Sequence, residues 1–301
     1  MPPHTGPPRP PVTGAPGDVT RRPQPTAAPA DVRAAASAGR VVLAFVLRDF
    51  ATAPHLLRVP LLLDLAFGVV NLVVFLFISR AVSTPAGGGF EHSASYFDFV
   101  AVGITFMLVV QTATTQLTGR IAKEQRGGTL EMLAAQPVPL WVFATGLAAY
   151  PFLFALLRAG IYLGVLGLVL GLHVGQASWL GVVLVLAAGS AATMGIGIML
   201  MALSVAVGHG DAVARVLVVG LSFVSGTYFP IAYLPPLVQE GSAALPTRVA
   251  LDGLRGALAG GHWGGSAGGL LVATAVLLPL SIWLFGRALE SAGRRGVLTR
   301  A

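Results

Sequence analysis

The sequence predicts an all-α integral membrane protein with six transmembrane helices, an N-terminal interfacial amphipathic helix and an outer re-entrant helical segment before the last span. The 301 residues are 55% hydrophobic and 10% charged, whereas soluble domains carry about 25% charged residues. The apolar residues gather into six long runs, and most cations flank them. A chain with so few polar residues could not cover a globule in water, so the bilayer is its expected solvent.

Two segments precede the first apolar run. Residues 1–36 hold ten of the 21 prolines and almost no large apolar residue. Such a segment buries too little surface to offset its ordering entropy, so we predict a disordered cytosolic tail. Residues 37–58 follow as an amphipathic helix that is too short and too charged to span, which suits the headgroup layer of the membrane. Its apolar side carries Val42, Phe45, Val46, Phe50 and Leu57.

Residues 59–287 form the predicted membrane domain, and residues 288–301 form a second cytosolic tail. Each span is judged against the roughly 20 apolar residues that cross a bilayer. Glycines spaced by four in the third span, and several in the fourth, are expected to let helices pack closely. The predicted spans are 60–78, 99–117, 140–172, 179–207, 216–229 and 267–285, and the third-span glycines are Gly160, Gly164, Gly167 and Gly171.

The distribution of cations sets the orientation. With six spans and a cytosolic N-terminus, the inner segments hold fifteen of the 19 Lys and Arg residues and the outer segments hold three. Because cytosolic loops are enriched in Lys and Arg, we predict a multi-pass protein of the cell membrane with both termini in the cytosol. An odd number of spans would leave one Arg-rich terminus outside.

Residues 230–258, between the fifth and sixth spans, are the predicted outer re-entrant segment. Pro230, Pro235 and Pro236 break the preceding helix. The helix beyond them is too polar to span, and its charged residues are spaced for a small ion network. Its apolar face carries Leu251, Leu254 and Leu258, and its charged residues are Arg248, Asp252 and Arg255.

The densest charged stretch between two spans is RIAKEQRGGTLEMLAAQPVP, which begins at Arg120. Gly127 interrupts its first helix, Thr129 is a good N-cap for a second, and Pro137 ends that helix. We name residues 120–137 the coupling segment. A short amphipathic helix between two spans is well placed to contact a soluble protein, and a plain solvated loop is the alternative.

The coupling segment resembles its counterpart in ABC type-2 transporter permeases, where an acidic residue precedes Gly-Thr-Leu-Glu, a Leu and then a Pro. The matching residues are Glu124, Gly128, Thr129, Leu130, Glu131, Leu133 and Pro137. A second stretch, SGTYFPIAYLP at 225–235 followed by LPTRVALDGLR at 245–255, resembles the run near the outer mouth of these permeases. Thr247 and Arg248 stand where members commonly carry Leu-Thr. The resemblance covers about residues 40–287.

The resemblance implies the permease subunit of an ATP-driven ABC transporter, exporting an amphiphilic drug-like molecule, a lipid or a glycan carrier. It also implies a separate ATP-binding-cassette ATPase subunit and a permease homodimer in membrane lipid. The residues on which the ATPase would dock are Glu124, Gly128, Thr129, Leu130, Glu131 and Leu133. A phosphate-binding loop ends in Gly-Lys-Ser/Thr, but the single lysine, Lys123, lies between Ala and Glu, so ATP hydrolysis is expected on another subunit.

Three polar residues fall inside the predicted spans: Asp64, Asn71 and Arg158. Ionisable groups in a bilayer are costly, so each is a candidate for the transport pathway or for polar packing. Asp64 and Asn71 share one face of the first span. A position near the cytosolic surface is the simpler explanation for Asp64, and snorkelling or pairing is the alternative for Arg158.

Other chemistry has little support in the residues. The chain has no cysteine and its six histidines are scattered, so we expect no catalytic residue, metal or cofactor. DGLRGALAG is similar to the start of a phosphatidyl-alcohol transferase motif, but those enzymes need further aspartates, and the next acidic residue is Glu290. Cations that flank spans argue against a nucleic-acid partner. An intramembrane lipid-modifying enzyme and a non-transporting membrane scaffold remain the alternative functions.

Overall fold

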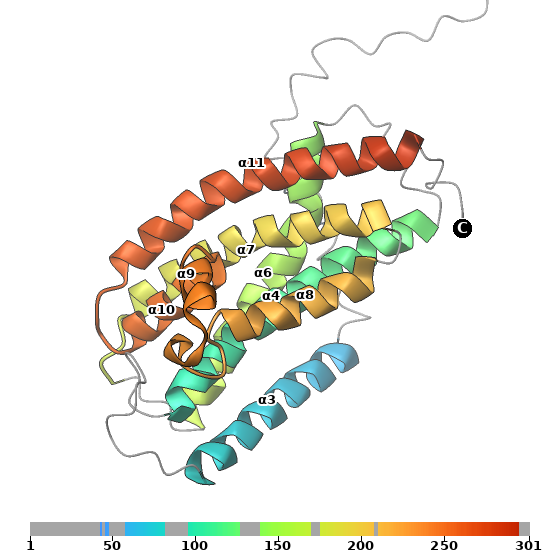
Figure 1. The fold of residues 1–301 in the computed structure, drawn as a ribbon. Coiled ribbons are helices and arrows are strands. Elements are labelled where there is room, and N and C mark those ends of the chain that lie inside the picture. Colours follow the sequence, from blue (N-terminus) through green and yellow to red (C-terminus); the bar gives the residue numbers. More distant parts are fainter. Residues whose placement is uncertain are drawn as a thin grey trace, which may run out of the picture. The chain divides into compact units, whose positions relative to one another are not determined.

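The computed structural model describes Leu43, Val46 and Leu47 and residues 58–81, 96–126, 139–169, 175–207 and 210–294. Within these residues all regular structure is helical (Figure 1). The six long helices are α3 (Arg58–Ala81), α4 (Tyr96–Arg126), α6 (Leu140–Leu168), α7 (Trp179–Val207), α8 (Gly210–Val224) and α11 (Gly264–Arg294). Between α8 and α11 lie the 3-10 turn η1 (Ile231–Tyr233) and two short helices, α9 (Pro236–Ala243) and α10 (Pro246–Leu258).

Each predicted span overlaps one long helix. By length and composition, α4, α6, α7 and α11 are able to cross a membrane. Shorter apolar stretches lie in α3 and α8, at Leu65–Ser79 and Ala212–Val224. Four candidate spans are therefore found among the described residues, and a total of six stays a prediction.

Two helix ends differ from the prediction. Helix α6 ends at Leu168 rather than near residue 172, in a stretch rich in glycine, which is a poor helix former. Helix α8 ends at Val224 rather than near residue 229. Gly226 has a φ of 74°, and the amides of Gly226 and Thr227 donate to the carbonyl oxygens of Phe223 and Ser222. This is the Schellman pattern, in which a left-handed glycine terminates a helix.

Helix α7 is central to the packing. It lies along α11 (Figure 1) and also contacts α4, α6, α8 and α10. Its glycines permit these close approaches: a Cβ atom added at Gly189, Gly195 or Gly197 would lie 2.9–3.0 Å from a side chain of a neighbouring helix. The packing role predicted for the glycines of the fourth span is therefore confirmed at these positions.

The glycines of the third span behave differently. Gly160 and Gly164 on α6 are exposed, and a Cβ added at either would meet no atom within 4 Å. The sequence pattern predicted close helix packing here, but within the described part of the chain no helix packs against this pair. The spacing of small residues identifies a helix face that another helix can approach closely, but it does not identify which helix does so.

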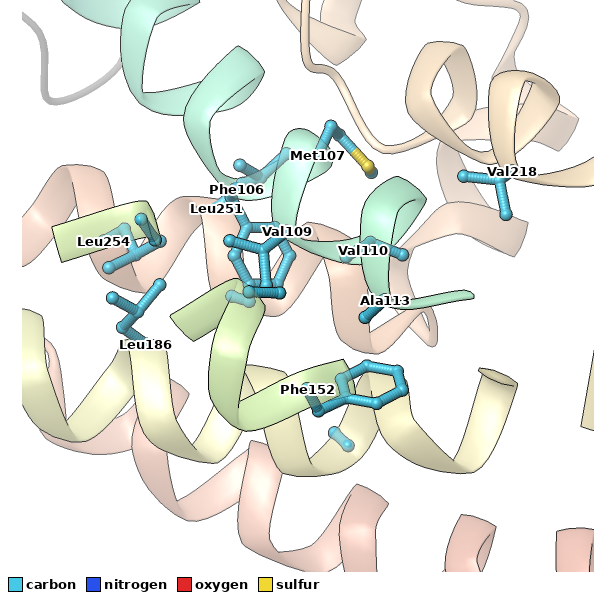
Figure 2. Close-up of a cluster of buried hydrophobic side chains, with 14 of the residues drawn as sticks. Phe106, Met107, Val109, Val110, Ala113, Phe152, Leu186, Val218, Leu251 and Leu254 are labelled. Atoms are coloured by element: carbon cyan, nitrogen blue, oxygen red, sulfur yellow. The ribbon is translucent and has the colours of Figure 1, made fainter. Parts of the chain in front are cut away.

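The apolar core is built around α4. In its most apolar window 83% of α4 is buried, against 17% for α11, so α4 is an interior helix and α11 a peripheral one. Figure 2 shows Phe106 and Met107 of α4 among side chains from four other helices. These side chains include Phe152 of α6, Leu186 of α7, Val218 of α8 and Leu251 and Leu254 of α10. The apolar face predicted for the segment before the last span is thus buried in the core.

The predictions for both chain ends fall largely outside the described residues. This is true of the tail at 1–36 and of most of the interfacial helix at 37–58, of which Leu43, Val46 and Leu47 are helical. At the other end, α11 continues to Arg294, beyond the predicted end of the last span. The domain boundaries given above remain predictions.

Candidate functional site

The coupling segment joins the end of α4 to the start of α6. The backbone of α4 is helical through Glu124 to Arg126, and α6 begins at Leu140 after Pro139. Gly128, Thr129, Leu130, Glu131 and Leu133 lie outside the described residues, as does the side chain of Glu124. Their assignment as docking residues remains a prediction. The structure describes the helix on each side of them, which is the end of α4 and the start of α6.

A cation–π contact joins the last turns of α4 to the first half of α6. The guanidinium carbon of Arg120 on α4 lies 5.0 Å from the ring centroid of Tyr150 on α6. Such contacts contribute about 0.5–1 kcal/mol at accessible sites and more where they are desolvated. Arg120 belongs to the charged stretch of the sequence, and the structure gives it a role in packing the base of the coupling segment.

Arg158, the candidate in the third span, is buried rather than snorkelling. Its side chain is 3% exposed. One terminal nitrogen donates to the hydroxyl of Tyr162 at 3.1 Å, and the other lies 3.4 Å from the hydroxyl of Thr112 on α4. Arg158 thus crosslinks α4 and α6 through polar contacts inside the bundle. This agrees with the pairing alternative given above, and a role in a transport pathway stays a prediction.

Tyr162 connects this polar cluster to α3. A Cβ atom added at Gly68 of α3 would overlap the phenol end of Tyr162, which is 1% exposed. Gly68 therefore lets α3 lie directly against the tyrosine. The other candidates of the first span are on the same helix: Asn71 is half-buried, and only the backbone of Asp64 is described. The structure thus places the three candidates on two neighbouring helices, α3 and α6.

The second motif forms a compact structure that we name the outer cap, residues 225–258. Its centre is Arg255 of α10, which is 3% exposed. One terminal nitrogen donates to the carbonyl oxygens of Phe99 on α4, at 3.1 Å, and of Gly226 in the turn after α8, at 2.9 Å. A single side chain therefore joins three parts of the chain through charge-assisted hydrogen bonds.

The ion network predicted in this segment is present. The Nε atom of Arg248 lies 3.7 Å from Asp252, and a terminal nitrogen of Arg255 lies 3.9 Å from the same carboxylate. Arg248 also donates to the carbonyl oxygen of Gln239 and to the hydroxyl of Ser242, both at 2.7 Å. Because Asp252 is 48% exposed, its ion pairs contribute little alone, and the buried carbonyl contacts of Arg255 matter more.

Close backbone packing completes the outer cap. A Cβ added at Gly103 of α4 would overlap the carbonyl oxygen of Thr227, so the turn after α8 lies directly on α4. The hydroxyls of Ser225 and Thr247 share a hydrogen bond. Thr247 is one of the two positions at which the chain departs from the pattern of the permeases that it resembles. Its hydrogen bond to Ser225 links α10 to the end of α8.

The sequence pattern missed the role of Arg255. The spacing of the charges predicts Arg255 only as a member of the ion network with Arg248 and Asp252, yet Arg255 follows Leu251 by four positions and precedes Leu258 by three. That spacing places it on the buried face of the helix, so the helical periodicity contained the signal.

In the part of the chain that the structure describes, no group of three or more His, Cys, Asp or Glu residues lies together as a metal site would require.

Comparison with known proteins identifies the family of the chain. No curated protein matches the chain. A comparison with protein families matches residues 40–259 to the family described as ABC-2 type transporter. The matched region contains both the coupling segment and the outer cap, and it covers well over half of the 301 residues. The chain therefore belongs to the ABC-2 type transporter family and is a multi-pass membrane component of such a transporter.

Proposed function

We propose that the chain is the permease subunit of an ATP-driven exporter and that a separate ATP-binding-cassette ATPase docks on the coupling segment. The carrying observation is the family match over residues 40–259 together with the position of the segment between two candidate spans, α4 and α6. Both flanking helices are packed against each other. A force applied between them would therefore reach the core.

The proposed docking surface has apolar anchors and a charged rim. Leu130 and Leu133 share one helical face, while Glu124 and Glu131 flank it. Buried apolar anchors dominate binding energy at most interfaces, whereas hydrated rim charges contribute little. We therefore assign affinity to the two leucines and orientation to the two glutamates.

We place the transport pathway between two copies of the chain. In the described part of the chain the interior is packed with large apolar side chains such as Phe106, Leu117 and Met201, which favours a pathway between two copies over one through a single chain. Two copies would enclose a pathway between them. The substrate class stays that of amphiphilic drug-like molecules, lipids or glycan carriers.

Helix α8 is the best candidate to face the second copy. Its 15 residues extend about 22 Å, less than the roughly 30 Å hydrocarbon core of a bilayer, and the chain then turns at Gly226. The turn at Gly226 is buried against α4 and α10 in the single chain. Val216 and Phe223 on α8 are exposed there, so this apolar face of α8 is available to a second copy.

Co-purification with an ATPase encoded beside this gene tests the docking proposal. The variant Leu130→Ala with Leu133→Ala should lose the ATPase and transport while inserting normally. A matched control, Leu170→Ala with Leu172→Ala, removes two leucines at the far end of the third predicted span, away from the coupling segment, and should retain both ATPase binding and transport. Wild-type ATPase binding and transport in the Leu130/Leu133 variant would show that the coupling segment is not the docking site.

Cysteine crosslinking tests the two-copy proposal separately, because the natural chain has no cysteine. Val216→Cys on α8 should form a disulfide-linked dimer in membranes. Val272→Cys on α11 is the control, since it is similarly exposed, at 66% against 72%, but lies on a different helix. Equal crosslinking at both positions would indicate random collision and would contradict the assignment of α8.

A further inference from the structure

A groove between the start of α6 and the end of α11 is distinct from the coupling segment and from the outer cap. Its volume is about 650 Å³, within the usual range for a small-molecule site. Pro279 and Gly286 of α11 contribute little side-chain bulk to it, while two tryptophans border it. The residues used below are Trp141 of α6 and Ile282, Trp283, Arg287 and Glu290 of α11.

The lining changes from apolar to charged along α11. Ile282 and Trp283 come first, then Arg287 one turn later and Glu290 three residues beyond it. The guanidinium carbon of Arg287 lies 5.1 Å from the ring centroid of Trp283, which directs the cation toward the groove. An occupant must therefore have an apolar part and, at one end, a charged part.

The position of the groove favours a lipid. Both α6 and α11 are candidate spans, and the groove lies at the ends predicted to be cytosolic. Trp141 and Trp283 are 49% and 54% exposed, and tryptophan is enriched at the level of the lipid headgroups. Acyl chains are the most abundant apolar groups at such a surface, so a lipid can fill the groove without a protein partner.

We propose that this groove binds a zwitterionic aminophospholipid, with its phosphodiester at Arg287, its headgroup ammonium at Glu290 and an acyl chain along Ile282 between the two tryptophans. The pair of opposite charges, three residues apart on one helix, matches the opposite charges of a phosphoethanolamine headgroup. An anionic headgroup would satisfy Arg287 but meet repulsion from Glu290. A choline headgroup would lack N–H groups, so it could donate no hydrogen bond to the carboxylate of Glu290. This site does not depend on transport.

Tryptophan quenching by brominated lipids tests the proposal in the full-length chain. In the Trp179→Phe/Trp263→Phe variant, Trp141 and Trp283 are the remaining tryptophans. In phosphatidylcholine vesicles, brominated phosphatidylethanolamine should quench them saturably at a low mole fraction. Brominated phosphatidylcholine and phosphatidylglycerol should quench only in proportion to their amounts. The reciprocal variant, Trp141→Phe/Trp283→Phe, should show proportional quenching with every lipid.

Charge variants test the two headgroup contacts. Arg287→Gln should raise the mole fraction for half-quenching roughly tenfold, the effect of losing one charge-assisted hydrogen bond. Glu290→Gln should make the ethanolamine and glycerol lipids equivalent. Arg215→Gln removes an exposed cation outside the groove and should change nothing. In native mass spectrometry, the wild-type chain should retain phosphatidylethanolamine over phosphatidylglycerol, and Glu290→Gln should lose this preference.

Three results would overturn the proposal. Proportional quenching by all lipids in the parent variant would leave no specific site. Equal retention of the glycerol and ethanolamine lipids by the wild-type chain would remove the role of Glu290. No quenching by any lipid would mean that a protein segment or a second copy fills the groove.

Discussion

The guanidinium carbon of Arg255 on α10 lies 3.5 Å from the ring centroid of Phe99, near the start of α4. The same side chain donates to the carbonyl oxygen of Phe99. Arg255 therefore uses one residue of α4 twice, through its ring and through its backbone. Because the arginine is 3% exposed, both contacts are made away from water, where a cation–π contact is worth about 2 kcal/mol.

Arg255→Leu should lower the free energy of unfolding by about 3 kcal/mol or more, because it removes the buried cation and leaves two carbonyl oxygens without its hydrogen bonds. Arg255→Lys should recover only part of this loss, since an ammonium cannot reproduce the planar fork. Unfolding in mixed detergent micelles measures both. Arg248→Leu, at a side chain that is 25% exposed, is the control and should cost about 1 kcal/mol. Equal losses at the two arginines would contradict the buried clamp.

Gly103→Ala should destabilise the protein by about 2 kcal/mol, because the added methyl group would overlap the backbone of Thr227 and force the turn after α8 away from α4. Gly119→Ala on the same helix is the matched control. A Cβ there meets no atom within 4 Å, so the better helix former should be neutral or stabilising by up to about 1 kcal/mol. Thermal unfolding of the two variants compares them directly. Two similar midpoints would show that the turn does not rest on α4.

Arg158→Leu should impair transport or dimer assembly while membrane insertion stays normal, because it removes the polar link between α4 and α6. Tyr162→Phe removes only the hydroxyl that accepts from Arg158 and should have a smaller effect on the same measurements. Substrate efflux and crosslinked dimer yield are the readouts. Unchanged efflux and dimerisation in Arg158→Leu would leave a role in packing alone, which unfolding in micelles would then report.

Cysteine labelling checks the orientation. Gly88→Cys, in the segment between the first two predicted spans, should react with an impermeant thiol reagent added outside intact cells. Gln125→Cys, at the coupling segment, should react only after the membrane is opened. The natural chain has no cysteine, so the background is low. The reverse pattern would invert the proposed topology and would move the groove of Trp141 and Trp283 to the outer surface.

The helix positions could be predicted because each depends on a local property, the length of an apolar run. The central segments of all six predicted spans are helical. The predicted end of α8 is wrong because the true end depends on the conformation of one residue, Gly226, and the small residues Ser225 and Thr227 beside it do not mark a boundary by hydropathy before Phe229. Hydropathy does not register a left-handed glycine, whereas the Ser-Gly-Thr sequence allows one.

The candidate site could be predicted only in part, because several of its contacts join residues that are far apart in the sequence. The ion network of Arg248 and Asp252 follows from spacing within one helix and was predicted correctly. The contacts from Arg255 to Phe99 and Gly226 join segments 156 and 29 residues apart, which no local pattern specifies. For Arg158, the sequence predicts a cost of burial and leaves snorkelling and pairing open. The choice between them required the position of Thr112 on another helix.

Helix α4 is continuous for 31 residues without a proline, unlike α6 and α11, which contain Pro151 and Pro279. Its length is about 46 Å. The coupling segment lies at one end, and Phe99, the residue that Arg255 contacts, lies near the other. Tilting such a rod by about 10° around its middle would move each end by about 4 Å in opposite directions. A displacement at the coupling segment would therefore also displace the outer cap, and it would shift the core side chains that pack along α4 between them.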